Sequence, residues 1–323
     1  MAILKNILLS GLLVLFGVLN GISVMAMADP ITDTCSKFPD AGPKAMNRLA
    51  KTKQPDRGPL WEVVKDGRRS FLYGTLHVAK LEWDFPGPTI KKALNASQEI
   101  AVELDTTNPT LGARMNAPME INNAAPASAE FIALAARVSE QFRRACLDEA
   151  NFGSADLSSK VLSLTFLSAR DAGLFPDFAI DSSLIGYARI TGKKITELET
   201  SDEQRRVIGG ANPTSIEGDI ARLESGEARE QLIKLGSAWA DGDFAEIERY
   251  FSWCNCADEK AEISRLLDDR NAVLAERIAH IYEKRDDVFA AIGVLHMINP
   301  GNVIDRLQRM GYSVRQLTAR AQP

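Results

Sequence analysis

Stretches in which hydrophobic and polar positions alternate predict the strands of this chain, and stretches with helical spacing separate them. Alternation at 60–64 and 70–73 flanks Asp66-Gly67, a two-residue hairpin signal. Further strands are expected at 100–102, 195–198, 288–292 and 312–314, and helices at 89–96, 303–309 and, with a break at 241–243, through 215–282. Strands that alternate with helices predict an α/β domain with a central, largely parallel sheet covered by helices on both faces.

Two stretches rich in Ala and Leu, 127–146 and 156–172, also have helical spacing. They predict a helical insertion at about 127–172 within a single domain that spans 29–323. The insertion is either a lid or an extra layer of plain scaffold. Asp181 and Ser182 are candidate N-caps of a helix through Arg189, and Ser201 and Gln204 have the spacing of a capping box.

The first 28 residues have the features of a signal peptide. Lys5 supplies a positive start, residues 7–24 are apolar, and Ala26-Met27-Ala28 matches a signal-peptidase cleavage site. We expect cleavage after Ala28 and a periplasmic or secreted protein with no membrane span left after processing. An uncleaved membrane anchor is the alternative.

Charge and cysteine content narrow the possible partners and the compartment. The 323 residues include 38 Lys and Arg against 43 Asp and Glu, and the net charge of −5 argues against a nucleic-acid partner. Four cysteines predict at least one disulfide in an oxidising compartment: Cys35, Cys146, Cys254 and Cys256. We expect Cys254 and Cys256 not to pair with each other, because a Cys-x-Cys bridge closes a very small, strained ring.

Two of the three histidines end the same motif, a strand followed by Gly-x-x-His. Gly74 leads to His77, and Gly293 leads to His296. Glycine permits a sharp turn at the end of a strand, after which the imidazole can point over the edge of the sheet. The matched settings predict two related halves that share one site at the carboxyl ends of the strands. His280 lies in a helix without such a partner and is interpreted as structural or solvated.

The two motif histidines are predicted to be metal ligands, because neutral imidazole binds Zn, Mn, Co or Fe well. Glu103 follows a buried strand and would complete a set of two His and one carboxylate, or act as a general base. Such a set leaves room for a water whose pKa the metal lowers. The alternative is that each histidine is a hydrogen-bonded scaffold residue.

Three further positions are candidates for the same site. Glu199 ends a predicted strand, although it could merely favour the N-terminus of the helix that follows. Asp181 could bind the metal or cap its own helix. Arg270, followed by Asn271 in a long helix, could stabilise a substrate anion. The alternative for Arg270 is a surface salt bridge with Asp268, Asp269 or Glu276.

A series of short motifs spans the chain from Leu60 to Val314: Leu60-Trp61, Tyr73-Gly74-Thr75-Leu76-His77, Glu103-Leu104-Asp105, Asp181, Leu198-Glu199-Thr200 with Gln204, Trp239-x-x-Gly242-Asp243, Arg270-Asn271, and Gly293-Val294-Leu295-His296 with Gly311-Tyr312. In these motifs and their order the chain resembles the TraB/GumN family, which is related to the TIKI metalloproteases and, more distantly, to erythromycin-esterase-like folds. The resemblance implies a metal-dependent peptidase, with Mn or Co held by His77, His296 and Glu103.

The residues and the resemblance predict a hydrolase of peptide or similar acyl bonds with a divalent ion, Mn, Co or Zn, as its cofactor. The expected ligands are His77, His296, Glu103 and Asp181, and the expected catalytic residues are Glu103, Glu199, Arg270 and Asn271. The rival is a periplasmic binding module that captures metal, haem or a small peptide without turnover. Esterase chemistry would use the same residues on another bond.

Overall fold

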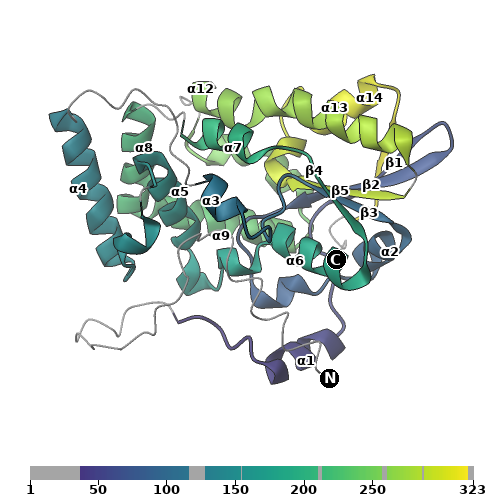
Figure 1. Cartoon of the computed structure of the whole chain (residues 1–323), viewed down its shortest axis with the longest axis horizontal. Helices are drawn as coiled ribbons and strands as arrows, with labels where there is room; N and C mark the ends of the chain where they lie inside the picture. The colour runs from purple at the N-terminus through teal and green to yellow at the C-terminus, as the bar shows by residue number, and fades with distance from the viewer. Residues whose placement is uncertain are drawn as a thin grey trace.

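The computed structural model of the chain describes residues 37–115, 128–153, 155–209, 213–256, 260–285 and 287–318. The predicted signal peptide at 1–28 and Cys35 lie outside these ranges. Within them, helices surround a six-stranded sheet, as the sequence predicts for an α/β fold (Figure 1). No helix in these ranges is long and apolar enough to cross a membrane.

The sheet has the strand order β4-β3-β5-β2-β1-β6. Its strands are β1 (Leu60–Lys65), β2 (Arg68–Thr75), β3 (Glu99–Val102), β4 (Lys194–Glu197), β5 (Val288–Gly293) and β6 (Ser313–Gln316). The pairs β3–β4, β3–β5 and β2–β5 are parallel, and β1 runs antiparallel to both β2 and β6. Five strands therefore point the same way, and the expectation of a largely parallel sheet is confirmed.

The predicted hairpin at Asp66 and Gly67 joins β1 to β2. Both residues have positive φ, 52° at Asp66 and 76° at Gly67, as a tight two-residue turn requires. The hairpin explains why β1 runs opposite to β2, because two residues can connect only antiparallel neighbours.

The helices of the described ranges complete the element list: α1 (Pro43–Lys51), α2 (Pro88–Ala96), α3 (Leu111–Met115), α4 (Ala129–Arg144), α5 (Leu157–Leu167), α6 (Ile180–Thr191), α7 (Ser201–Ile208), α8 (Pro213–Ser225), α9 (Glu227–Ala240), α10 (Phe244–Glu248), α11 (Tyr250–Trp253), α12 (Lys260–Ile263), α13 (Asp269–Lys284) and α14 (Val303–Arg309). Short 3-10 helices lie at η1 (Leu81–Asp84), η2 (Glu149–Phe152), η3 (Arg170–Ala172), η4 (Pro176–Phe178) and η6 (Val294–Met297), and a π-helical turn at η5 (Ser264–Asp268) precedes α13. The predicted break at 241–243 separates α9 from α10, and a further break falls at Gly226, where φ is 82°.

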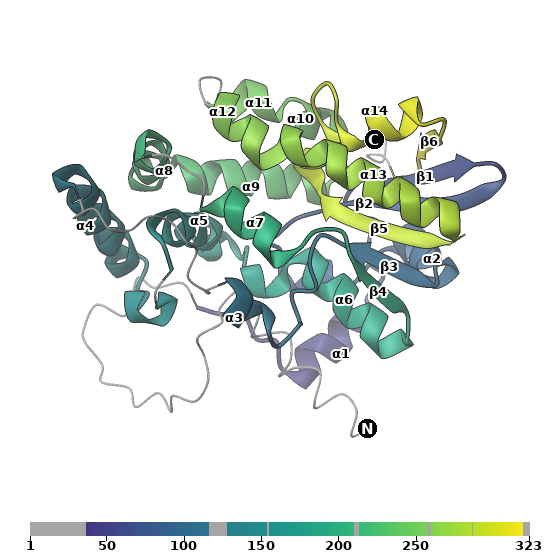
Figure 2. The same cartoon turned by 45° about the horizontal axis from the view of Figure 1, so that its top comes forward.

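Alternate residues of the strands face two different cores. In β5, Phe289 and Ala291 join the core that also contains residues of α2, α6 and α9, whereas Ala290 and Ile292 join the core beneath α13 and α14. Figures 1 and 2 show α13 and α14 on one face of the sheet and α2 and α6 on the other. Because both faces of β5 are buried, its sequence does not alternate between apolar and polar residues. It is a continuous apolar run.

A third core lies away from the sheet, within a helical layer formed by α4, α5 and α8. Val138 of α4, Val161 of α5 and Ile220 of α8 are among its buried residues. The helical insertion expected at 127–172 accounts for the first two helices, and residue 127 itself lies outside the described ranges. The third helix, α8, lies outside the predicted insertion, so the layer is assembled from two separate parts of the chain.

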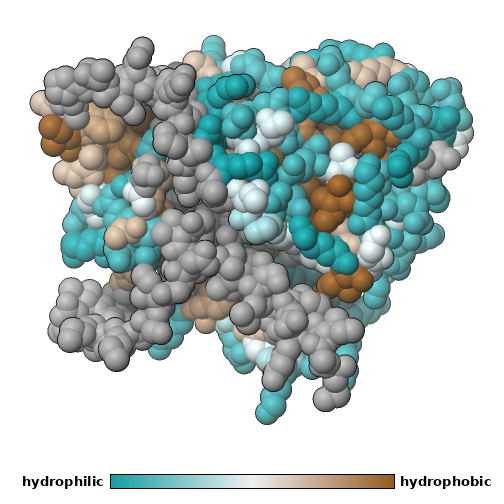
Figure 3. Space-filling view, viewed as in Figure 1, coloured by the Kyte–Doolittle hydropathy of each residue, from teal (hydrophilic) through white to brown (hydrophobic). Residues whose placement is uncertain are grey.

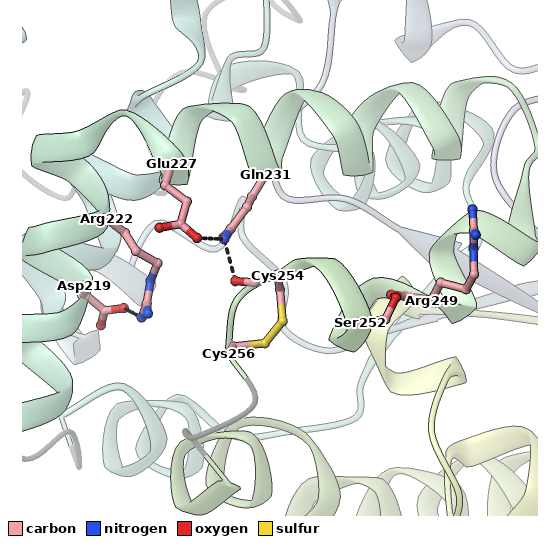
Figure 4. The surroundings of a disulfide bond; sticks show 8 residues. All are labelled: Asp219, Arg222, Glu227, Gln231, Arg249, Ser252, Cys254 and Cys256. Atoms are coloured by element: carbon pink, nitrogen blue, oxygen red, sulfur yellow. Dashed lines mark hydrogen bonds and ion pairs between the residues drawn. A yellow bond between two sulfur atoms is a disulfide. The ribbon is translucent and has the colours of Figure 1, made fainter.

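The expectation that Cys254 and Cys256 do not pair is wrong, because a disulfide joins them (Figure 4). Their Cα atoms are 5.2 Å apart, within the usual range, and Asn255 between them adopts a left-handed conformation with φ of 52°. This turn brings the two side chains to the same side. Gln231 of α9 fixes the turn by donating from Nε2 to the Cys254 carbonyl and to Glu227 Oε1. At least one disulfide is present, as predicted.

Candidate active site

Three neighbouring parallel strands deliver the predicted site residues to one edge of the sheet. The strands β3, β5 and β2 lie side by side, and Thr75 at the end of β2 pairs with Gly293 at the end of β5. His77, Glu103 and His296 follow these strand ends within three residues. This edge is where sites form in open α/β sheets.

The two Gly-x-x-His turns differ in their local structure. Gly74 lies inside β2 opposite Ile292, whereas Gly293 is the last residue of β5. A Cβ on Gly74 would stand 2.8 Å from Val294 Cγ2, so this position admits only glycine without movement of its neighbours. The chain then continues to His77 without a helix, whereas His296 lies in the 3-10 helix η6.

His77 is held by Asp181. Its Nδ1 donates to Asp181 Oδ2 at 3.0 Å, and Thr75 Oγ1 donates to Asp181 Oδ1 at 2.6 Å. The proposed N-cap role of Asp181 is wrong, because α6 begins one residue earlier, with Ala179 as its N-cap. The buried carboxylate is therefore available to the imidazole. Partial burial of the ring, whose side chain is 43% exposed, lowers the pKa of His77, but Asp181 outweighs this effect and raises it to about 9.

His296 is held by a neutral amide instead of a carboxylate. Its Nδ1 donates to Asn271 Oδ1 at 2.8 Å, which leaves Nε2 unprotonated in the neutral ring. His296 is 3% exposed, and this burial, with the charge of Arg270, lowers its pKa to about 3. Its Nε2 lies 4.0 Å from Glu103 Oε1. At neutral pH the second histidine is thus uncharged and has an unprotonated Nε2.

Arg270 joins the two strand-end glutamates. Its Nη2 donates to Glu103 Oε2 at 2.7 Å and to Glu199 Oε2 at 2.5 Å, and its Nε donates to Glu199 Oε1 at 2.8 Å. Both carboxylates are buried, with 5% and 6% exposure. Burial alone would raise the pKa of Glu103, but Arg270 and the two histidines lower it. The guanidinium pairs with these carboxylates and not with the acidic neighbours on its own helix.

Gln204 is the second donor to the same two carboxylates, from Nε2 to Glu199 Oε2 at 3.0 Å and to Glu103 Oε2 at 3.3 Å. The capping box expected at Ser201 and Gln204 is wrong by one residue. Thr200 is the N-cap and Glu203 completes the box. The shift leaves Gln204 on the face of α7 that looks into the site.

The sides of His77, Glu103 and His296 that these partners do not hold lie around Gly293. Its N–H donates to Glu103 Oε1 at 2.7 Å. A Cβ built on Gly293 would lie 3.3 Å from that oxygen, 3.7 Å from His296 Cδ2 and 3.8 Å from His77 Nε2. The missing side chain therefore leaves a small space bordered by both histidines and Glu103.

The donor set around this space has the chemistry of a divalent-metal site. Each histidine has its Nδ1 fixed by an oxygen, which directs Nε2 inward, and Glu103 offers one oxygen that Arg270 does not take. Among the described residues, however, no group of three or more His, Cys, Asp or Glu side chains is close enough to ligate an ion as placed. The residue types fit a metal, and their side chains would have to close on it.

Several residues that support the site were not predicted to belong to it. Thr75 and Gln204 contact the predicted acids directly, and Trp239 donates from Nε1 to the Gly74 carbonyl at 2.8 Å. All three lie in the motifs that carry the family resemblance, which was the available signal. Phe166, 5.9 Å from His77 between ring centroids, had no such signal. His280 is exposed on α13, as expected for a solvated residue.

Comparison with protein-family models gives a match to the TraB/PrgY/gumN family over residues 59–316. This range contains every strand of the sheet and every residue of the site. Corresponding comparisons found no match among curated proteins and none among solved structures.

Proposed function

This chain belongs to the TraB/PrgY/gumN family, and from that premise we propose that it is an exported, metal-dependent hydrolase of peptide or similar acyl bonds. The observation that supports the proposal most is the convergence of His77, His296 and Glu103 on the space at Gly293. Two scaffold histidines and a carboxylate would have no reason to surround one point that lacks a side chain, with His77 Nε2 and Glu103 Oε1 facing that point and His296 Nε2 4.0 Å from the same carboxylate oxygen.

His77, His296 and Glu103 would hold a divalent ion, Mn, Co or Zn, which when bound polarises a carbonyl and lowers the pKa of water. The two histidines differ in the acceptor that holds Nδ1. Asp181 gives His77 a charged partner, and Asn271 gives His296 a neutral one. Such partners fix the ring orientation and the tautomer that presents Nε2.

Arg270, Gln204 and Glu199 would act on Glu103 and not on the substrate. Arg270 and Gln204 bind Glu103 Oε2 and so leave Oε1 directed at the site. Glu199 accepts two hydrogen bonds from Arg270 and keeps the guanidinium in place. We therefore assign Arg270 and Glu199 as positioning residues, whereas the sequence led us to expect an anion stabiliser in Arg270 and a catalytic residue in Glu199.

The test is metal titration of the mature protein followed by digestion of a peptide library. Mn²⁺, Co²⁺ and Zn²⁺ are titrated by calorimetry into the wild type, His77→Ala, His296→Ala and the control His280→Ala. We expect one ion per chain in the wild type and the control, and at least about tenfold weaker binding in the two site variants. Cleaved peptide should exceed the enzyme in molar amount only with the wild type and the control.

Two outcomes would contradict the proposal. Full metal stoichiometry and normal turnover in both site variants would return the Gly-x-x-His turns to a scaffold role. Saturable, stoichiometric uptake of metal, haem or peptide without any cleaved product would favour the binding module instead.

A further inference from the structure

The candidate site is open to solvent on the side of one histidine. The side chain of His77 is 43% exposed, whereas those of Glu103, Asp181 and His296 are at most 6% exposed. Among these four side chains, His77 is therefore the one that a substrate can contact without displacing a buried group. Residues that neighbour His77 are the ones that a substrate meets first.

Phe166 of α5 is the aromatic neighbour of His77. Their ring centroids are 5.9 Å apart and the planes are inclined by 70°, an edge-to-face contact. Phe166 is only partly buried and packs against the core on the α2 and α6 face of the sheet. It therefore presents apolar surface beside the exposed histidine.

The other apolar residues of α5 face a different way. Val161 and Leu164 are buried in the core of the helical layer, with residues of α4 and α8. Figures 1 and 2 show α5 at the inner side of that layer, nearer the sheet than α4. Phe166 is thus a residue of the helical layer that contacts His77.

We propose that Phe166 is a wall of the substrate site and selects substrates that carry a bulky nonpolar side chain next to the scissile bond. The inference rests on the proposed function for the reaction, but its selectivity in binding can be measured without turnover. An aromatic ring offers a large, rigid contact area at low cost in conformational entropy. A charged or very small group at the same position would leave the ring in contact with water.

The test uses labelled peptide pools, each with one position fixed as Leu, Phe, Gly or Asp, and measures their binding to the mature protein by fluorescence anisotropy. At one position we expect Leu and Phe pools to bind about three- to tenfold more tightly than the Gly pool, the range of one aromatic contact. Phe166→Ala should abolish this preference, and Phe166→Leu should keep part of it.

The matched control is Phe131→Ala, in α4 of the same helical layer. Phe131 is 44% exposed, and Figure 3 shows apolar surface over α4 at the left of the molecule. This variant should retain the wild-type preference. Mn²⁺ affinity, measured in parallel, should be the same in Phe131→Ala as in the wild type.

Three results would overturn the inference: no preference in the wild type, the same preference in Phe166→Ala, or equal weakening of all pools by that variant. Metal binding and turnover without any preference would defeat this inference alone. If the protein neither binds metal nor cleaves peptide but still shows a Phe166-dependent preference, the proposed reaction is wrong. The role of Phe166 in substrate selection would then stand.

Discussion

Gly293 donates its backbone N–H to Glu103 Oε1 at 2.7 Å, and the same oxygen lies 3.3 Å from the point where a Cβ on Gly293 would stand. One residue thus both orients the carboxylate and, by lacking a side chain, keeps the space in front of it clear. Its φ of −51° is accessible to any residue, so glycine serves here to leave space and not to permit the backbone conformation.

Gly293→Ala should therefore fold normally and bind metal poorly. The new methyl group would stand within 4 Å of Glu103 and both histidines, so we expect Mn²⁺ affinity to fall by about tenfold or more. Calorimetric titration measures the affinity, and circular dichroism checks the fold. Gly186→Ala is the control, because a Cβ there meets nothing within 4 Å. Unchanged affinity in Gly293→Ala would mean that the ion, if bound, lies elsewhere.

Arg270→Ala should be strongly destabilising, because it leaves the buried carboxylates of Glu103 and Glu199 without their cation. We expect a loss of about 3–5 kcal/mol in the free energy of unfolding, measured by urea denaturation. The double variant Arg270→Ala, Glu199→Gln should recover part of the loss, since one buried charge is removed.

Arg229→Ala is the matched control for Arg270. Arg229 makes a bidentate ion pair with Asp171, but the two side chains are 40% and 51% exposed. Its loss should cost less than about 1 kcal/mol. Similar costs for the two arginine variants would contradict the role assigned to the buried pair.

Asp181→Asn should lower the pKa of His77 from about 9, because the carboxylate that favours the imidazolium becomes a neutral amide. Thr75 can still donate to the amide oxygen, so the fold should be kept. The ring protons of His77 followed by NMR against pH in the metal-free protein give the pKa directly. A His77 pKa that does not fall would show that Asp181 is not the cause of its elevation.

Asp84, which lies outside the candidate site, should make the stability of the protein depend on pH. It lines a cavity of about 70 Å³ between η1 and α6, where burial raises its pKa from 3.8 to about 8, although Ser183 Oγ donates to it. Because the folded state holds the proton more tightly, the stabilising contribution is complete below pH 4 and is lost as the pH rises to 8. The melting temperature of Asp84→Asn should therefore fall less than that of the wild type over this range. Parallel melting curves against pH would count against the assignment.

The sequence was sufficient for the strands and for the edge of the sheet that carries the site. Runs of apolar residues end at Thr75, Val102 and Gly293, and the Asp66-Gly67 turn reverses the chain once. These signals are local, because hydrophobic period and turn chemistry act over a few residues. The carboxyl ends of parallel strands must share an edge, so the meeting of His77, Glu103 and His296 followed from the strand assignments.

Helix starts and the short disulfide were less predictable, because competing local solutions differ by one residue. Thr200 and Ser201 are both good N-caps. Because α7 begins after Thr200, Gln204 faces the site and donates to Glu199. The same holds for Asp181, which gained its role when α6 began at Ile180. Cys254 and Cys256 could pair only because Asn255 accepts a left-handed conformation, which the sequence permits but does not require.

Only the tertiary structure decided which side chains of the site are ion-pair or hydrogen-bond partners. Arg270 and Glu103 are 167 positions apart, His77 and Asp181 are 104 apart, and nothing local to either pair distinguishes these partners from other charged residues. The choice is made when buried charges must be matched, because an unpaired charge in the interior costs several kcal/mol while a surface pair contributes little. The two similar Gly-x-x-His motifs therefore end in histidines with different surroundings. His77 faces the carboxylate of Asp181, and His296 faces the amide of Asn271.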